Sequence, residues 1–216
     1  MLTWHPPLLR SEGMDLSIAL NTSLVLATAY ALGCLATGYY LVRLRTTRDI
    51  RHTGSGSIGA TNVSRVLGWP GFVVTLLLDA GKGALAVVLA RQCQLDSWAI
   101  WLAALAVVAG HVWPVQLRFR GGKGAATYLG AVLTFDWRIG LFLVPLTLVG
   151  YLIVRHPTLA GLIAVAVLPA VLWMVGYPRE VNLGLTALAT LILFAHRANI
   201  RAGACQIRLD EGLGRE

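Results

Sequence analysis

The chain alternates between long apolar runs and short polar segments. Within the runs, Leu, Ala and Val occupy every helical face, without the period-2 alternation of a transmembrane strand. This pattern is typical of helices in lipid, whose backbone polar groups bond within their own segment. It predicts seven spans, which cover residues 16–41, 70–90, 97–113, 124–135, 139–154, 159–176 and 182–195. The fourth and the last are shorter than the roughly 20 residues of a full crossing.

Composition favours a membrane protein over a soluble helical bundle. Of the 216 residues, 56% are hydrophobic and only 13% are charged, whereas about a quarter of a soluble domain is charged. The expected fold class is therefore all-α, a polytopic integral membrane protein with about seven transmembrane helices. Cys34, Cys93 and Cys205 have no C-x-x-C spacing, so the sequence predicts neither a disulfide nor a metal site.

The basic residues collect in alternate loops. The odd-numbered loops and the tail hold 13 of the 18 Lys and Arg residues, namely Arg43, Arg45, Arg48, Arg51, Arg65, Arg118, Arg120, Lys123, Arg155, Arg197, Arg201, Arg208 and Arg215. Lys82 lies within a span, and the other positions are Arg10, Arg91, Arg138 and Arg179. The positive-inside rule then places the N-terminus outside and the C-terminus in the cytoplasm. We expect an N-terminal extension (1–15), a membrane domain (16–201) and a cytoplasmic tail (202–216).

The first loop, residues 54–65, contains small and hydroxyl-bearing residues that suit an anion. Glycines let backbone N–H groups approach a ligand, and Arg65 adds a guanidinium that can hold phosphate with two bonds. The candidate phosphate contacts here are Ser55, Gly56, Thr61, Asn62 and Arg65. The glycines also fit a dinucleotide-binding pattern, but no strand precedes them and Asp79 lies in a span, so that interpretation is rejected. A flexible turn is the structural alternative.

Charged and polar side chains also mark the second span and the third loop. Asp79 and Lys82 lie three residues apart on one helix face, where they either pair with each other or contact a substrate. His111 ends the third span and has a structural alternative. Further along, Gly121, Gly122 and Lys123 offer a mobile backbone and a point charge to a phosphate, without the Ser or Thr that follows the lysine of a Walker A loop.

The last polar segments contribute a hydroxyl, an imidazole and an amide. Thr158 is either a phosphate contact or the N-cap of the helix that begins at Leu159. His196 and Asn199 lie three residues apart, so a continuing helix presents both on one face. The chain has no H-x-x-x-x-D dyad, no D-x-x-D-G-type metal cluster and no His or Cys pair with zinc spacing.

Four ordered motifs resemble the PlsY family, the bacterial acyl-phosphate:glycerol-3-phosphate acyltransferases. They are the Gly-Ser-Gly-rich stretch at 54–65, Asp-x-x-Lys-Gly at 79–83, Gly-His-x-x-Pro with Phe-Arg-Gly-Gly-Lys-Gly at 110–124, and His-x-x-Asn-Ile at 196–200. The chain departs from the family pattern at Ser57, where Asn is usual, at Thr158, where Ser is usual, and after Arg201.

The resemblance implies an enzyme of the bacterial inner membrane with its active site on the cytoplasmic side. It implies transfer of a fatty acyl group from acyl phosphate to the 1-hydroxyl of glycerol 3-phosphate, without cofactor or metal, in contact with membrane lipid and not with nucleic acid. His196, Asn199, Lys123 and Arg65 would be the catalytic residues. The attacking hydroxyl would pass its proton to His196 or to a donor phosphate oxygen. A transporter of a phosphorylated metabolite is the alternative function, and a non-catalytic scaffold is a third.

Overall fold

The structure, a computed structural model, describes residues 12–202, and within that range it consists of helices and their connections. The helices are α1 (Glu12–Cys34), α2 (Thr37–Thr46), α3 (Ala60–Gln92), α4 (Ser97–Val112), α5 (Ala125–Phe135), α6 (Gly140–Val154), α7 (Pro157–Met174) and α8 (Arg179–Ala195), with short 3₁₀ turns η1 (Ile50–His52), η2 (Val115–Leu117) and η3 (Trp137–Ile139). The all-α class is confirmed. Residues 1–11 of the predicted extension and 203–216 of the predicted tail lie outside the described residues.

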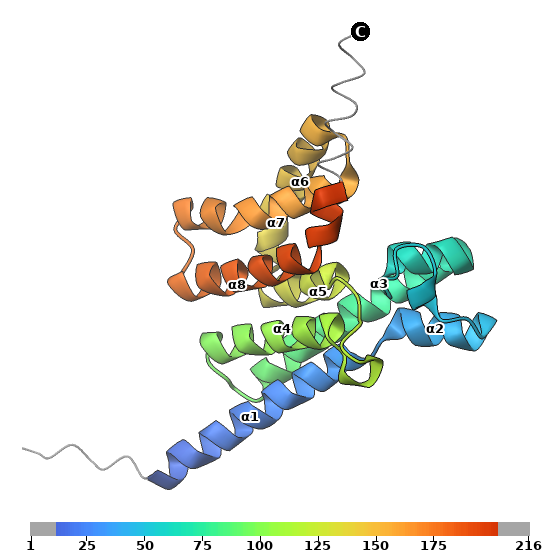
Figure 1. Cartoon of the computed structure of the whole chain (residues 1–216). Coiled ribbons are helices and arrows are strands. Elements are labelled where there is room, and N and C mark those ends of the chain that lie inside the picture. Colours follow the sequence, from blue (N-terminus) through green and yellow to red (C-terminus); the bar gives the residue numbers. More distant parts are fainter. Residues whose placement is uncertain (1–11, 203–216) are drawn as a thin grey trace, which may run out of the picture.

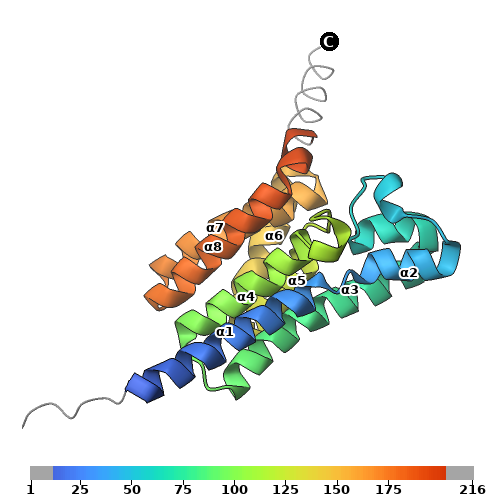
Figure 2. The same ribbon diagram turned by 60° about the horizontal axis from the view of Figure 1, so that its bottom comes forward.

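Helix α4 is the centre of the bundle, since it packs against α1, α3, α5 and α8. The most extensive pairings join α3 to α5, α1 to α4 and α6 to α7 (Figures 1 and 2). Small residues let several of these helices approach closely. Gly33 on α1 lies against Gly110 on α4, and Gly83 on α3 lies against the Thr127 carbonyl on α5. Close backbone approach at glycines is typical of helix packing in membranes.

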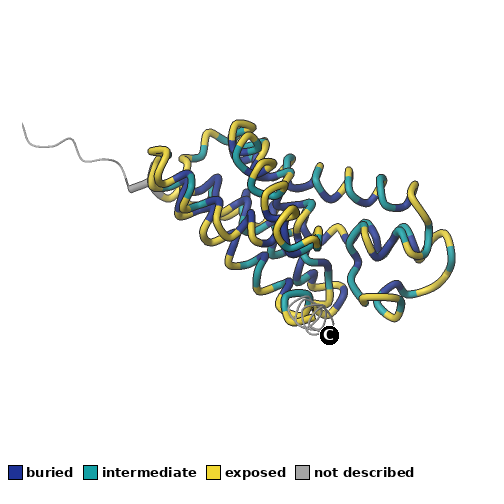
Figure 3. Tube along the Cα trace, turned by 90° about the horizontal axis from the view of Figure 1, so that it is seen from above, coloured by how far each residue is buried: buried dark blue, intermediate teal, exposed yellow. Residues whose placement is uncertain are grey.

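The outer surface of the bundle is apolar, as a lipid-facing surface must be. On α6, Leu141, Val144 and Leu148 are 61%, 68% and 58% exposed. Figure 3 shows such exposed positions on the outer sides of the helices and the buried ones between them. Among the described residues, five helical segments are long and apolar enough to cross a membrane, whereas α5 and α8 have only 11 and 17 residues. The short fourth and seventh runs predicted from the sequence correspond to these two helices.

The first predicted span lies within the candidate membrane span Leu16–Thr46, but it is not one continuous helix. The apolar run 16–41 is divided between α1 and α2, with a break at Leu35 and Ala36. The cause lies in another helix, because the Lys82 ammonium donates hydrogen bonds to the carbonyls of Gly33 (3.1 Å) and Leu35 (2.8 Å). These bonds satisfy carbonyls at the end of α1 that a continuing helix would use itself.

Beyond this break, residues 36–67 form a small lobe at one side of the bundle, seen at the right in Figures 1 and 2. The lobe contains α2, η1, the glycine-rich loop and the first turns of α3. It has its own hydrophobic cluster, made by Ala36, Val42, Ile50, Ile58 and Val63 together with Leu117 from the loop after α4. The lobe returns to the bundle at Gly68, whose φ of 67° and ψ of −162° interrupt α3 just before Pro70.

Candidate active site

A cavity of about 610 Å³ lies where four helix ends meet the small lobe. Helices α4 and α8 end here and α5 and α7 begin here, so their end residues border one space. Its polar lining residues are Ser55, Ser57, Thr61, Asn62, Arg65, Asp79, His111, Lys123, His156, Thr158, His196 and Asn199. Its apolar wall is formed by Phe72 and Leu76 of α3 with Ala125 and Ala126 of α5. The cavity can therefore accommodate a molecule with a charged head and a hydrocarbon chain.

Asn62 organises the glycine-rich loop rather than reaching out to a ligand. Its side chain is buried, and its amide nitrogen donates to the carbonyls of Ser57 (2.8 Å) and Thr53 (2.9 Å). Its amide oxygen accepts the backbone N–H of Ser55 at 3.1 Å. Gly54 is required next to it, because φ is 57° and a Cβ there would collide with Asn62 and with the Arg65 guanidinium. Asn62 thus holds Ser55 and Arg65 at the cavity.

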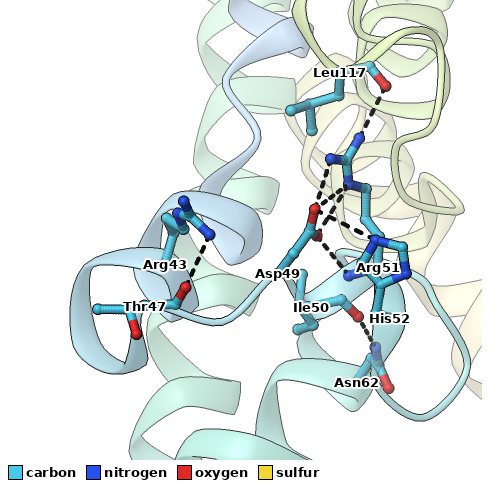
Figure 4. Close-up of polar contacts among 8 residues, drawn as sticks. All are labelled: Arg43, Thr47, Asp49, Ile50, Arg51, His52, Asn62 and Leu117. Carbon is cyan, nitrogen blue, oxygen red and sulfur yellow. Dashed lines mark hydrogen bonds and ion pairs between the residues drawn. The ribbon is translucent and has the colours of Figure 1, made fainter.

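The loop is fastened further by an ion pair in the small lobe (Figure 4). The Arg51 guanidinium contacts the Asp49 carboxylate at 2.7 Å and also donates to the carbonyl of Leu117 at 3.2 Å. The side-chain hydrogen bond from Arg51 lowers the pKa of Asp49 to about 2. This pair links the lobe to the loop between α4 and α5. It therefore connects the two segments that carry Arg65 and Lys123.

Lys123 is the second cation of the site. Its ammonium donates to the Asn199 side-chain oxygen at 2.6 Å, which joins the third loop to the last described segment. Burial and then the positive charge of Arg65 lower the pKa of Lys123. Arg65 and Lys123 both border the cavity, so both cations face the same space. Two such cations attract an anion that carries more than one negative charge.

His196 follows the last residue of α8, and the helix resumes at residue 197. Its Nδ1 lies 2.9 Å from the carbonyl of Ile192. A carbonyl only accepts, so Nδ1 carries the proton and Nε2 of the neutral ring keeps a free lone pair. Burial is the main cause that lowers the pKa of His196. The ring is therefore neutral and able to accept a proton at physiological pH. Despite the interrupted helix, His196 and Asn199 both border the cavity.

Thr158 is not the N-cap of α7, which was one of its two predicted roles. The cap is His156, whose Nδ1 accepts the backbone N–H of Leu159 at 3.4 Å, and Pro157 is the first helical residue. Proline suits that position because it lacks the N–H that would be unpaired there. The hydroxyl of Thr158 is free for the cavity that it borders. His156 also borders the cavity and was missed as a site residue.

Asp79, Lys82 and His111 form a buried cluster behind the cations. The Lys82 ammonium lies 2.9 Å from the Asp79 carboxylate, and Nδ1 of His111 lies 3.5 Å from the same oxygen. Asp79 and His111 border the cavity, whereas Lys82 turns toward the end of α1. The ion pair between Asp79 and Lys82 is thus present. Within residues 12–202, no group of three or more His, Cys, Asp or Glu side chains is placed to hold a metal ion.

Most predicted site residues converge on the cavity, and three glycines do not line it. Gly56 lies in a turn, where its N–H donates to the carbonyl of Thr53 at 3.1 Å. Gly121 and Gly122 pack behind Lys123, against the end of α4. Phe72 and Leu76 could not be identified as site residues from the sequence, because nothing distinguishes them from the other apolar residues of α3. The predicted first loop is partly helical, since α3 begins at Ala60 and carries Arg65.

Comparison with known proteins assigns a family to this arrangement. Residues 23–204 match the family model described as glycerol-3-phosphate acyltransferase. The glycerol-3-phosphate acyltransferase 1 of Desulfitobacterium hafniense (strain Y51) is 47% identical over 178 residues, which are 80% of this chain and 86% of the relative. The glycerol-3-phosphate acyltransferase of Jannaschia sp. (strain CCS1) is 44% identical over 182 residues, 84% of this chain and 89% of the relative.

Two solved structures share the fold. Both are crystal structures of PlsY, an integral membrane glycerol 3-phosphate acyltransferase. Its glycerol 3-phosphate form superposes with a TM-score of 0.76 at 35% identity, over 83% of this chain and 90% of that one. Its lysophosphatidic acid form superposes with a TM-score of 0.74 at 34% identity, with the same coverage.

Proposed function

The chain belongs to the glycerol-3-phosphate acyltransferase family and is a membrane acyltransferase, and from that premise we propose the reaction that it catalyses. It transfers a fatty acyl group from acyl phosphate to the 1-hydroxyl of glycerol 3-phosphate, giving lysophosphatidic acid and phosphate. The observation that carries this proposal is the cavity itself. It is lined by two cations and a neutral histidine together with the apolar side chains of Phe72 and Leu76. Such a lining suits the two substrates, because glycerol 3-phosphate is a small phosphate ester and acyl phosphate carries a phosphate on a hydrocarbon chain.

The cations and hydroxyls would hold the two phosphates. Arg65 and Lys123 neutralise charge that would otherwise keep two anions apart. The hydroxyls of Ser55, Thr61 and Thr158 supply further donors, from the glycine-rich loop, α3 and α7 in turn. Asn62 and the glycines at 56, 121 and 122 shape the backbone that presents these groups. The acyl chain would extend from these groups along α3 and α5 toward the lipid.

The chemistry needs no covalent enzyme intermediate, because phosphate is already a good leaving group. The hydroxyl oxygen of glycerol 3-phosphate bonds to the acyl carbonyl carbon as the bond from that carbon to the phosphate oxygen breaks. The hydroxyl proton passes to Nε2 of His196 or to an oxygen of the donor phosphate. In either case His196 and Asn199 orient the substrates, and Lys123 stabilises charge on the phosphate that leaves.

A donor comparison tests the proposal. The purified protein receives glycerol 3-phosphate with palmitoyl phosphate or with palmitoyl-coenzyme A, and lysophosphatidic acid is quantified. We expect lysophosphatidic acid when the donor is palmitoyl phosphate and none when it is palmitoyl-coenzyme A. One inorganic phosphate should be released for each lysophosphatidic acid formed. Equal use of the two donors would refute the assignment of acyl phosphate. Absence of product with both donors would refute the acyl transfer itself.

We also propose that the chain crosses a bacterial inner membrane seven times, with the cavity on the cytoplasmic side. The distribution of basic residues supports this orientation. The native cysteines at 34, 93 and 205 are first replaced, and then Ser57→Cys and Arg179→Cys are introduced separately. A membrane-impermeant thiol reagent should label the variant at 179 in intact spheroplasts, and the variant at 57 only after permeabilisation. The opposite labelling would reverse the orientation.

A further inference from the structure

The buried cluster of Asp79, Lys82 and His111 has one member, His111, whose role is not explained by the contacts described so far. Asp79, Lys82 and His111 are 2%, 5% and 3% exposed. Buried ionisable groups in a membrane helix are retained when they pair or serve the site. Lys82 is accounted for by Asp79 and by the two carbonyls at the end of α1. The His111 ring lies between Asp79 and the third loop, where it meets Gly122.

On the loop side, the His111 ring lies directly beneath Gly122. The Cβ that an alanine would carry at 122 falls on this ring, with Cδ2 and Cε1 both 2.9 Å away and Nε2 closer. On the other side, Asp79 lies 3.5 Å from Nδ1 and limits how far the ring can retreat. The backbone adds to the contact, since the N–H of Gly122 donates to the His111 carbonyl at 3.0 Å and that of Gly121 to Val112 at 3.1 Å.

Lys123 follows Gly122 directly, so its backbone is fixed from both sides. Gly124, with φ of 81°, packs closely against Val108 and Ile192. The Lys123 ammonium therefore reaches Asn199 at 2.6 Å from a backbone that His111 supports on one side and Gly124 on the other. A displacement of Gly122 by the width of a methyl group would move the ammonium away from the cavity.

We propose that His111, packed against Asp79, is a positioning residue that sets the location of Lys123 by supporting Gly122. The ring acts through the loop and takes no part in bond making. The inference rests on the proposed function for the ligand of Lys123, which is a phosphate group. It explains why a glycine is needed at 122, where φ does not demand one.

The test uses complementary changes in size. Gly122→Ala should weaken binding of inorganic phosphate and lower kcat/KM for lysophosphatidic acid formation, each by about tenfold or more. His111→Ala/Gly122→Ala, which removes the obstructing ring, should recover at least threefold over Gly122→Ala. Gly81→Ala is the matched control, because a Cβ at 81 on α3 meets nothing within 4 Å. If the double alanine variant does not fold, His111→Asn/Gly122→Ala takes its place in the same comparison. Asn is smaller than His, and its amide keeps a donor toward Asp79.

A second measurement separates positioning from general damage. In a Lys123→Ala background, Gly122→Ala should cost less than twofold in phosphate affinity, because its effect acts through Lys123. A full additional loss in that background would overturn the inference. So would a Gly122→Ala protein as active as Gly81→Ala, or a double variant no better than Gly122→Ala. Absent phosphate binding in the unmodified protein would overturn it too. If that protein binds phosphate without forming lysophosphatidic acid, the proposed function fails and the phosphate affinities decide the inference.

Discussion

The contact between Lys123 and Asn199 allows the charge at the phosphate site to be changed without changing its shape. Asn199→Asp keeps the size of the side chain and adds one negative charge, 2.6 Å from the ammonium in the present geometry. A phosphate oxygen bound by Lys123 lies about 3 Å from Nζ, so the new carboxylate lies roughly 5 Å from that phosphate. Two unit charges about 5 Å apart repel by about 3 kcal/mol at an effective dielectric constant of about 20.

Because Lys123 is only partly buried, water and salt reduce that repulsion to about 1.5–3 kcal/mol. We therefore expect Asn199→Asp to raise KM for a phosphate substrate by about ten- to a hundredfold. Asn199→Ala removes one hydrogen bond and leaves the charge of Lys123, so its loss should be only about two- to tenfold. The ammonium lowers the pKa of the new carboxyl, so activity should not recover as the pH falls from 7 to 5.

The assay measures kcat and KM for both substrates from initial rates of lysophosphatidic acid formation. Thermal unfolding of Asn199→Asp and Asn199→Ala in the same detergent shows whether both remain folded. A KM for Asn199→Asp no higher than that of Asn199→Ala, with both proteins folded, would refute the view that Lys123 binds phosphate through its charge.

Four further expectations follow from the same geometry. Arg65→Lys should lose about ten- to a hundredfold in kcat/KM, because a point charge replaces a planar fork, and near-normal kinetics would contradict this. If His196 is the base, kcat/KM should fall as the pH drops through a value below 6.5, since burial lowers its pKa; a profile flat to pH 5 would assign the proton to the donor phosphate. Thorough chelation should leave activity unchanged, and loss restored by one divalent ion would refute this. Stability from the Asp49–Arg51 pair should be full above pH 4 and decline toward pH 2, by about 1–2 kcal/mol, and Asp49→Asn should abolish that dependence in acid unfolding.

The positions of the membrane helices were largely predictable from the sequence. The run predicted at 139–154 is the helix Gly140–Val154, and the run at 159–176 is Pro157–Met174. Composition is sufficient here because an isolated apolar segment must satisfy its own backbone in lipid, whatever its neighbours are. The same local argument explains why α5 was recognised as short.

The break between α1 and α2 was not predictable in this way. The apolar run continues through Leu35 and Ala36, and the group that ends the helix is Lys82, which is 47 residues from Leu35 in the sequence. Hydropathy depends only on the residues of the segment itself, so it cannot indicate a hydrogen-bond donor in another helix. Tertiary contacts of this kind decide helix ends where the local residues do not.

The sequence predicts which residues form the site better than it predicts what each of them contacts. Basic residues in alternate loops place polar segments at one end of the bundle, so Arg65, Lys123 and His196 meet there. Their types suggest phosphate chemistry wherever they meet. The sequence suggests Asn62 as a phosphate ligand, whereas in the structure its amide nitrogen is occupied by loop carbonyls. A side chain's partners depend on which backbone groups the fold leaves unpaired, and that is settled only in three dimensions.

The spacing of Asp79 and Lys82 left two interpretations open, a mutual ion pair and a substrate contact. In the structure the two interpretations do not exclude each other, because the two residues of the pair contact different parts of the molecule. Lys82 extends to α1 and ends that helix, whereas Asp79 faces His111 at the edge of the cavity. One ion pair thus connects the break between α1 and α2, after which the small lobe begins, to the loop that carries Lys123. The small lobe holds Arg65, so the same buried charges in α3 help to place both of the cations that we propose to bind phosphate.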